Sequence, residues 1–369
     1  MDGGLDGSAA ALRRDLRHFL GAEISRGGFD PQAGSFARFD AGFAARLGAA
    51  GFIGIDWPAD LGGQGGSALD RQVVAEELLA HGAPVRAHWA AEWLAGPLLR
   101  RAGTPAQQQE VLPRIAGGGL SLCIGLEEAA VGPDPMAMRS RAVAVGGGWR
   151  ITGRKSPVAD AGQAQRMILL ARTAPPEAGG AAGLTLFLVD LALPGITRRP
   201  LPDLAGSDAA AEVELAGVFV AADRVIGAVD EGWPEWLAVA EAALGAPDGW
   251  MRMQPLLAGL LDGLGIAAPA EADAAIGRLV AGLYALHGMS LDLAARDAGA
   301  AGPALLARLA AGHAAAVPEA VLRLLPTTTR RWPLSRALLA ATGDAARAPA
   351  REALWRAAAR RLRPGRPGR

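Results

Sequence analysis

The sequence predicts an α+β fold with an N-terminal helical domain, a middle β domain and a C-terminal helical bundle. Two observations lead to this prediction. Residues 119–173 contain short apolar runs separated by Gly, Pro and Asp, as expected for strands joined by turns. The segments before and after this stretch repeat apolar residues at helical spacing. We therefore expect domains at 1–118, 119–227 and 228–369.

The N-terminal domain is expected to begin with an amphipathic helix over residues 9–21. Its apolar face consists of Leu12, Leu16, Phe19 and Leu20. Arg13 and the neighbouring charged residues fall elsewhere on this helix. Further helices are predicted at 35–49, 67–81, 85–101 and 104–113.

The segment GFIGIDWPADLGGQGG, residues 51–66, is rich in glycine, and such a loop can cradle phosphate. It lacks the preceding strand and the following Lys-Ser/Thr of a phosphate-binding loop. Its glycine spacing also differs from GxGxxG. The composition therefore indicates tight turns rather than a nucleotide site.

His81, His88 and Glu92 are spaced so that one continuous helix would bring them to one face, as in a metal site. Gly82 and Pro84 interrupt that helix. The sequence therefore favours a surface histidine and a polar pair at i,i+4, and it predicts no metal site.

The charge and cysteine content exclude several function classes. Lysine plus arginine balances aspartate plus glutamate at 37 each, so net charge does not indicate a nucleic-acid partner. Lys155 is the single lysine, which gives it more weight than any one arginine. The single cysteine, Cys123, excludes an intrachain disulfide. With no secretion signal and no apolar run near the roughly 20 residues of a membrane span, we expect a cytoplasmic protein.

The β stretch is expected to continue with a buried strand at 184–191 and a strand and turn at 212–227. Helical patterns return from about Gly232 and have apolar faces broad enough to pack as a bundle. The last 23 residues contain eight arginines and one acidic residue, Glu352. Because no aromatic residues are interleaved in a recognised motif, this tail is predicted to be a solvated helix end rather than a nucleic-acid site.

Several local sequences, in this order, resemble the acyl-CoA dehydrogenase family. Residues 51–66 are similar to the family's Gly-aromatic-x-Gly-Ile-x-Trp-Pro-x-Glu-x-Gly-Gly-x-Gly, with Asp60 at the usual Glu. LCIGLEEAAVGPDPMAMRSRA occupies, without a gap, the place of the family's Cys-x-Gly-Phe-Ser-Glu-Pro-Gly-Ala-Gly-Ser-Asp. ITGRKSPVADAGQAQRMILLART continues the match. The resemblance is strong over residues 48–233.

The resemblance implies FAD-linked α,β-dehydrogenation of acyl-CoA thioesters in fatty acid or lipid catabolism, by a CH–CH oxidoreductase. It also implies that the middle domain is β-barrel-like, that FAD lies between this domain and the helical bundle, and that the protein is a dimer or tetramer. The positions that would contact the flavin are Ile124, Leu126, Glu127, Gly132, Val158 and Ala159.

Several of these positions depart from the family pattern. Glu127 replaces the hydroxyl residue that would bond the flavin, and an ionised carboxylate offers only acceptors. Pro133 replaces a serine and removes a backbone donor. Pro157, Val158 and Ala159 stand where the family has Trp-Thr/Ile-Ser/Thr, so an aromatic platform and a hydroxyl are missing. The sequence therefore keeps the apolar strand positions and turn glycines that the resemblance expects of a flavin-binding domain. The polar and aromatic positions that would contact the flavin are replaced.

The catalytic base also has no counterpart. The chain has no Phe-Gly of the family's pyrophosphate clamp, Ala348 would occupy the base position, and Glu352 aligns with a structural position. No catalytic residue is assigned. The sequence favours a degenerate subunit of a homo- or hetero-oligomer with another acyl-CoA dehydrogenase-like chain. The alternatives are an active enzyme with its base relocated to Glu241 or Glu128, and a non-redox acyl-thioester lyase or binding protein that uses Glu127 and Glu128.

Overall fold

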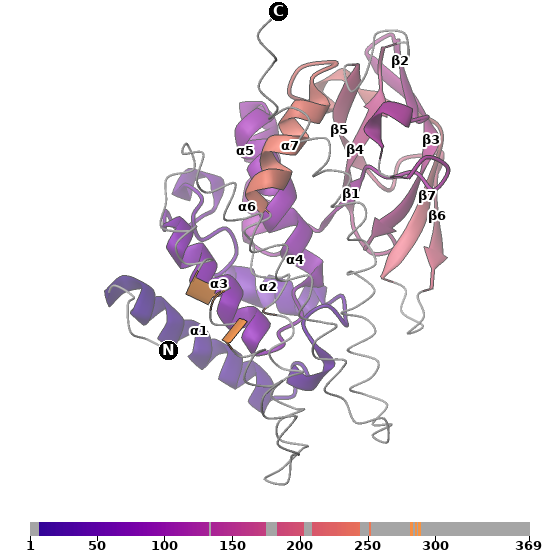
Figure 1. Ribbon diagram of the computed structural model, residues 1–369. Helices are drawn as coiled ribbons and strands as arrows, with labels where there is room; N and C mark the ends of the chain where they lie inside the picture. Colours follow the sequence, from indigo (N-terminus) through magenta and orange to yellow (C-terminus); the bar gives the residue numbers. More distant parts are fainter. Residues whose placement is uncertain are drawn as a thin grey trace, which may run out of the picture.

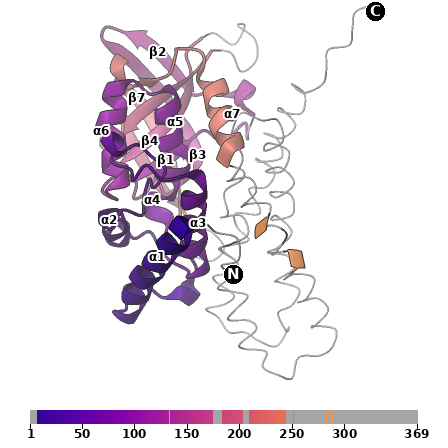
Figure 2. The same ribbon diagram turned by 90° about the vertical axis from the view of Figure 1, so that its left-hand side faces the viewer.

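The computed structural model describes residues 7–132, 134–174, 183–202 and 209–243, with positions 251, 281–282, 285 and 287–288. In this part of the chain a group of helices lies beside a large β-sheet (Figures 1 and 2), and α7 (Gly232–Ala243) contacts elements of both. The predicted order of a helical domain followed by a β domain is confirmed. Most of the predicted C-terminal bundle falls outside the described residues, and the domain boundaries stay predictions.

The N-terminal domain is helical throughout, as predicted. Its helices are α1 (Gly7–Ser25), α2 (Ala41–Ala49), α3 (Ala68–Ala80), α4 (Arg86–Ala90), α5 (Gly96–Ala102) and α6 (Pro105–Ala116), with short turns η1 (Pro31–Ala33) and η2 (Ala59–Leu61). Ser67 and Thr104 cap α3 and α6, each in a reciprocal capping box with the residue three positions on. The second predicted helix begins at Ala41 rather than 35, because the Asp40 side chain accepts the Phe43 N–H and caps the helix there.

Helix α1 buries Leu16 and Leu20, as the sequence indicates, but it also buries Arg13. The Arg13 guanidinium lies 3.4 Å from Glu76 and 3.0 Å from Glu77, both buried on α3. The expectation that Arg13 lies outside the buried face is therefore wrong. A charged group is tolerated inside the protein when an opposite charge is paired with it.

The predicted helix at 85–101 is one helical rod with a widened turn in its middle. The segment η3 (Ala91–Ala95) is a π-helix between α4 and α5. The Gly96 N–H donates to the carbonyl of Ala91, five residues earlier. Pro97 follows and has no N–H to continue the regular ladder, which accounts for the change of helix type at this point.

The middle domain is an eight-stranded sheet in the order β6-β7-β3-β2-β4-β5-β8, with β1 parallel beside β4. The remaining neighbours are antiparallel, except for one parallel residue pair between β2 and β4. Turns η4 (Pro135–Ala137) and η6 (Ala222–Arg224) connect strands. The strands are β1 (Leu122–Gly125), β2 (Arg141–Val145), β3 (Gly148–Ala159), β4 (Arg166–Arg172), β5 (Leu184–Asp190), β6 (Ile196–Leu201), β7 (Ala210–Ala221) and β8 (Val225–Ile226).

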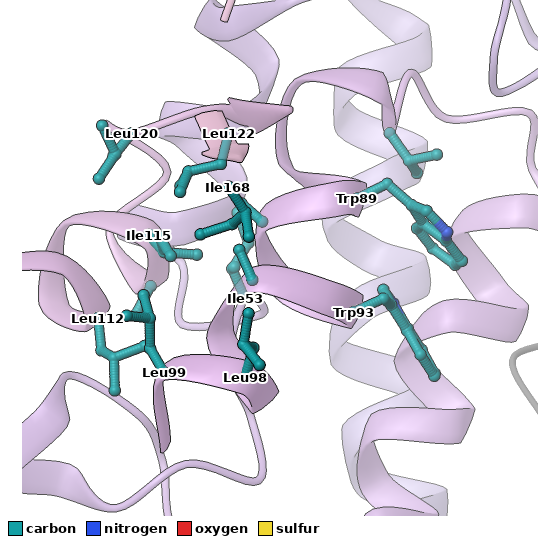
Figure 3. Close-up of a cluster of buried hydrophobic side chains, with 14 of the residues drawn as sticks. Ile53, Trp89, Trp93, Leu98, Leu99, Leu112, Ile115, Leu120, Leu122 and Ile168 are labelled. Carbon is teal, nitrogen blue, oxygen red and sulfur yellow. The ribbon is translucent and has the colours of Figure 1, made fainter. Parts of the chain in front are cut away.

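Strand β4 is buried on both faces and separates two hydrophobic cores. Ile168 and Leu170 point to the core shared with the helices, whereas Met167 and Leu169 point to the core of the sheet itself. Figure 3 shows Ile168 among helical side chains such as Leu98. Because the helices cover one face of the sheet, the end of β4 lies at the junction of the two domains.

Candidate functional site

A pocket lies where the segment after β1, Leu170 of β4 and the start of α7 meet. Its polar lining consists of Glu127, Glu128 and Asp134. Its other lining residues are Leu126, Val131, Gly132, Pro135, Met138, Leu170, Trp233 and Trp236. In the part of the chain that the structure describes, the lining combines apolar and aromatic surface with carboxylates and includes no side-chain cation.

Glu128 is held by three donors. The buried Lys155 ammonium donates to Glu128 Oε1 at 3.0 Å, and the backbone N–H groups of Arg139 and Ser140 donate to its two oxygens at 2.9 Å each. Burial works to raise the pKa of Glu128, but Lys155 and these hydrogen bonds outweigh it and hold the pKa below its ordinary value. Glu128 is therefore an ionised structural carboxylate, and its contacts argue against its use as a relocated base.

Lys155 has a second role, because its ammonium also donates to the carbonyl of Leu126 at 3.0 Å. This contact ties β3 to the segment that forms one wall of the pocket. Burial lowers the pKa of Lys155 to about 8, although Glu128 works in the opposite direction. The single lysine of the chain thus fixes the position of both Leu126 and Glu128.

The rim of the pocket at 134–138 is anchored by Arg172 at the end of β4. This buried guanidinium donates to the carbonyls of Pro135, Met136 and Met138 at 3.0 to 3.4 Å. Asp134 caps the short turn η4 by accepting the Met136 N–H at 2.9 Å. The rim is therefore held by hydrogen bonds from inside the protein.

The start of α7 is fixed by a small hydroxyl network. Thr173 donates to Asp230 at 2.5 Å, and the Asp230 N–H donates to the hydroxyl of Thr185 at 2.8 Å. Because α7 begins two residues after Asp230, this network sets the position of Trp233 and Trp236 against the pocket.

The structure brings together three of the six residues expected to contact a flavin. Leu126, Glu127 and Gly132 line the pocket. Ile124 is half-buried against the helical core. Val158 is fully buried in the core of the sheet, and Ala159 is exposed. A register shift in the β3–β7 pair between Lys155 and Val158 accompanies this separation.

The two adjacent glutamates, Glu127 and Glu128, both lie at the pocket. Strand β1 ends at Gly125, so Glu127 and Glu128 lie in the irregular segment after it, and both line the pocket. They still differ in role, because the Glu128 carboxylate already receives the Lys155 ammonium and two N–H groups.

The polar groups that line the pocket do not fit the ring of a flavin. A flavin ring that gains negative charge on reduction needs hydrogen-bond donors around its polar edge. Among the described residues, the pocket lining offers no hydroxyl, amide or cationic side chain, and the N–H groups of Val131 and Gly132 already donate to the Glu128 carbonyl. The side-chain donors that remain are the indoles of two tryptophans, and Nε1 of Trp236 is buried.

Sequence reasoning did not identify the tryptophans of α7 as site residues. Trp233 and Trp236 lie more than 100 positions after Leu126 in the chain. The signal that could have found them is their spacing, since positions three apart on a helix share one face.

The His81, His88 and Glu92 group does not form a metal site. The described residues contain no group of three His, Cys, Asp or Glu side chains able to hold a metal ion. His81 is half-buried, and its Nδ1 lies 2.8 Å from the Glu77 carbonyl. His88 and Glu92 are indeed an i,i+4 pair, with Nε2 and Oε2 4.0 Å apart, and both are buried. No helix in the described part of the chain is long and apolar enough to cross a membrane.

Two protein-family models match this chain. The model described as "Acyl-CoA dehydrogenase, N-terminal domain" matches residues 8–119. The model described as "Acyl-CoA dehydrogenase, middle domain" matches residues 123–218. Together the two matches cover more than half of the chain and meet near the predicted boundary between helices and strands.

Curated relatives carry the same family name. Acyl-CoA dehydrogenase FadE34 of Mycobacterium tuberculosis is 36% identical over 183 residues, which are 50% of this chain and 25% of that protein. Acyl-CoA dehydrogenase IpdE1 of the same organism is 36% identical over 190 residues, 51% of this chain and 49% of that protein. The matched part thus spans about half of IpdE1 and a quarter of FadE34.

Solved structures show that the fold is that of acyl-CoA dehydrogenases. The structure described as "Tcur3481-Tcur3483 steroid ACAD" has a TM-score of 0.76 at 23% identity and covers 93% of this chain and 94% of its own. The ChsE4–ChsE5 complex from Mycobacterium tuberculosis has a TM-score of 0.74 at 21% identity, covering 92% and 93%. A glutaryl-CoA dehydrogenase from Mycobacterium smegmatis in complex with FADH2 has a TM-score of 0.74 at 19% identity, covering 92% and 90%.

The comparisons agree with the architecture and with the sequence motifs around the pocket. FAD is the cofactor that this family likeness supports. The chain belongs to the acyl-CoA dehydrogenase family.

Proposed function

We propose that this chain is a degenerate subunit of an acyl-CoA dehydrogenase system, assembled with a second chain of the same family that holds the FAD. The observation that carries the proposal is the lining of the pocket. Glu127 and Asp134 supply acceptors, and Glu128 is bound to Lys155. A site built this way keeps its shape, and its carboxylates present acceptors where a flavin ring needs donors.

The proposal extends to an acyl-CoA or another acyl thioester as the ligand of the assembly, and to lipid catabolism as its setting. The apolar lining from Leu126, Met138, Leu170 and the α7 tryptophans suits an acyl group. The ChsE4–ChsE5 structure is described as a complex of two differently named chains, which supports pairing of unlike chains as an arrangement within this fold. The cytoplasmic location stays a prediction.

The two alternatives find less support. An active enzyme with its base at Glu128 conflicts with the three donors that hold this carboxylate ionised. Glu241 is half-buried on α7, and it is not among the residues that line the pocket. A lyase that uses Glu127 and Glu128 as an acid and base pair would need Glu128 to release Lys155.

The chain purified alone is expected to carry no stoichiometric flavin. The physical reason is that the pocket presents carboxylates where a flavin needs donors. The absorbance spectrum of the purified full chain, before and after incubation with FAD and gel filtration, measures this directly. A yellow complex with one FAD per chain that oxidises an acyl-CoA in a dye-linked assay would contradict the proposal.

Co-expression separates the subunit proposal from a flavin-free binding protein. A family member encoded beside this gene is expected to co-purify with the chain as a stable mixed oligomer that contains flavin. The partner expressed alone is the control for its own flavin content. If the two chains elute separately while each is folded, the proposed pairing is wrong.

A further inference from the structure

His88 and Glu92 are two titratable groups enclosed in the N-terminal domain, one turn apart on the helical rod 86–102. Their side chains are 1% and 3% exposed, and Nε2 of His88 lies 4.0 Å from Oε2 of Glu92. Neither nitrogen of the His88 ring has a hydrogen-bond partner among the described residues. A buried polar group without a hydrogen bond destabilises the folded state, so a bond between these two side chains would be favourable.

Glu92 lies in the π-helical segment η3, where the wide turn directs one carboxylate oxygen toward Gly54. The Gly54 N–H donates to Glu92 Oε1 at 2.9 Å, which leaves Oε2 on the side of His88. A protonated Oε2 can donate to a neutral imidazole nitrogen, and a shift of about 1 Å would bring the two atoms into hydrogen-bond range. A neutral acid and a neutral imidazole would then share one proton without burying a net charge.

The surroundings favour the neutral pair. Burial raises the pKa of Glu92 to about 7, with Asp56 adding to the rise while Gly54 and Arg71 oppose it. Burial lowers the pKa of His88 to about 3. The other titratable or charged groups on the elements around η3 are Arg86 on α4, Arg100 and Arg101 on α5, Glu110 and Arg114 on α6, Glu235 and Glu241 on α7, and Cys123 on β1.

We propose that a proton shared between the buried side chains of His88 and Glu92 stabilises the folded π-helical turn η3. Loss of this proton to solvent unfolds the turn locally. In the folded turn, Glu92 Oε2–H donates a hydrogen bond to His88 Nε2. When the turn unfolds, the covalent O–H bond of Glu92 breaks and its proton passes to solvent. The helix rod contacts β1 and α7, which lead into the pocket walls. The pair lies outside the pocket and needs no flavin. The result of its test is therefore independent of the subunit proposal.

Amide hydrogen exchange of the full chain tests the switch. Opening would return Glu92 toward its ordinary pKa of 4.5 from about 7. The folded turn thus binds a proton that the locally unfolded turn releases. Protection of its amides from hydrogen exchange therefore falls as the pH rises from 4.5 toward and past 7. Between about pH 6 and pH 8 the protection factors of residues 91–96 are expected to fall about tenfold, beyond the intrinsic pH effect on exchange.

Glu92→Gln keeps a neutral side chain at every pH and is expected to remove this change. Glu110→Gln is the matched control, because Glu110 lies on α6 and is paired with Arg166 and Arg224; it should keep the tenfold fall. Infrared titration of the unmodified chain is expected to show a protonated carboxyl band that disappears near pH 7. A pH response that persists in Glu92→Gln, or the absence of such a band from the unmodified chain, would overturn the proposal.

Discussion

Replacing Lys155 with methionine is expected to lower the free energy of unfolding by about 3–5 kcal/mol, because removal of one partner leaves a buried charge unpaired. Lys155 is fully buried, and Glu128 loses its only salt-bridge partner in the described part of the chain. The Leu126 carbonyl loses the same donor. Urea unfolding of the full chain, followed by tryptophan fluorescence, measures the change.

The neighbouring substitution Arg154→Met is the matched control. Arg154 is 54% exposed and pairs with Glu212 and Glu214 on the outer surface of the sheet. Its loss is expected to cost at most about 1 kcal/mol. The double variant Lys155→Met with Glu128→Gln should recover most of the stability, because no buried charge then remains. Equal losses for Lys155→Met and Arg154→Met would refute the role assigned to this pair.

Replacing Arg86 with methionine is expected to cost about 3 kcal/mol and to weaken the contact between the two domains. Arg86 begins α4, and two of its nitrogens lie 2.8 and 2.6 Å from one oxygen of Asp160 at the end of β3. Both side chains are largely buried, so the carboxylate would be left without this partner in a poorly hydrated position. Urea unfolding measures the change in the free energy of unfolding. The rate of limited proteolysis between the two domains measures how far their contact is weakened.

Arg199→Met provides the comparison for this second ion pair. Arg199 also binds carboxylates, those of Glu212 and Glu214, but its side chain is 56% exposed. Solvent screens such a pair, so a change below about 1 kcal/mol is expected. Faster proteolysis of the Arg199 variant than of the Arg86 variant would show that the Arg86–Asp160 pair does not hold the domains together.

Local signals in the sequence predicted most helix starts. Ser67 and Thr104 could be recognised as caps because each is followed three positions later by a residue that completes a capping box. Asp40 has the same capping chemistry, but apolar residues on both sides of it continue the helical pattern backward to 35. The pattern alone therefore placed that helix start too early.

The site could be predicted only in part. Leu126, Glu127 and Gly132 were identified because they belong to one continuous motif that forms one wall. Trp233 and Trp236 were missed, since their helical spacing shows only that they share one face, and the contacts with β5 that bring α7 to the pocket are not visible in the sequence. Val158 and Ala159 follow the same family motif, yet the register of β3 places them away from the pocket lining.

The sequence by itself determined the family likeness and the order of helices and strands. These are local properties, because periodicity, capping and motif order depend on residues close together in the chain. Only the tertiary structure decided which polar groups meet inside the protein. Arg13 with Glu76, Lys155 with Glu128, and Arg86 with Asp160 are each separated by 27 or more positions. Their pairing depends on how the elements pack, since a buried charge is stable only where packing brings an opposite charge to it.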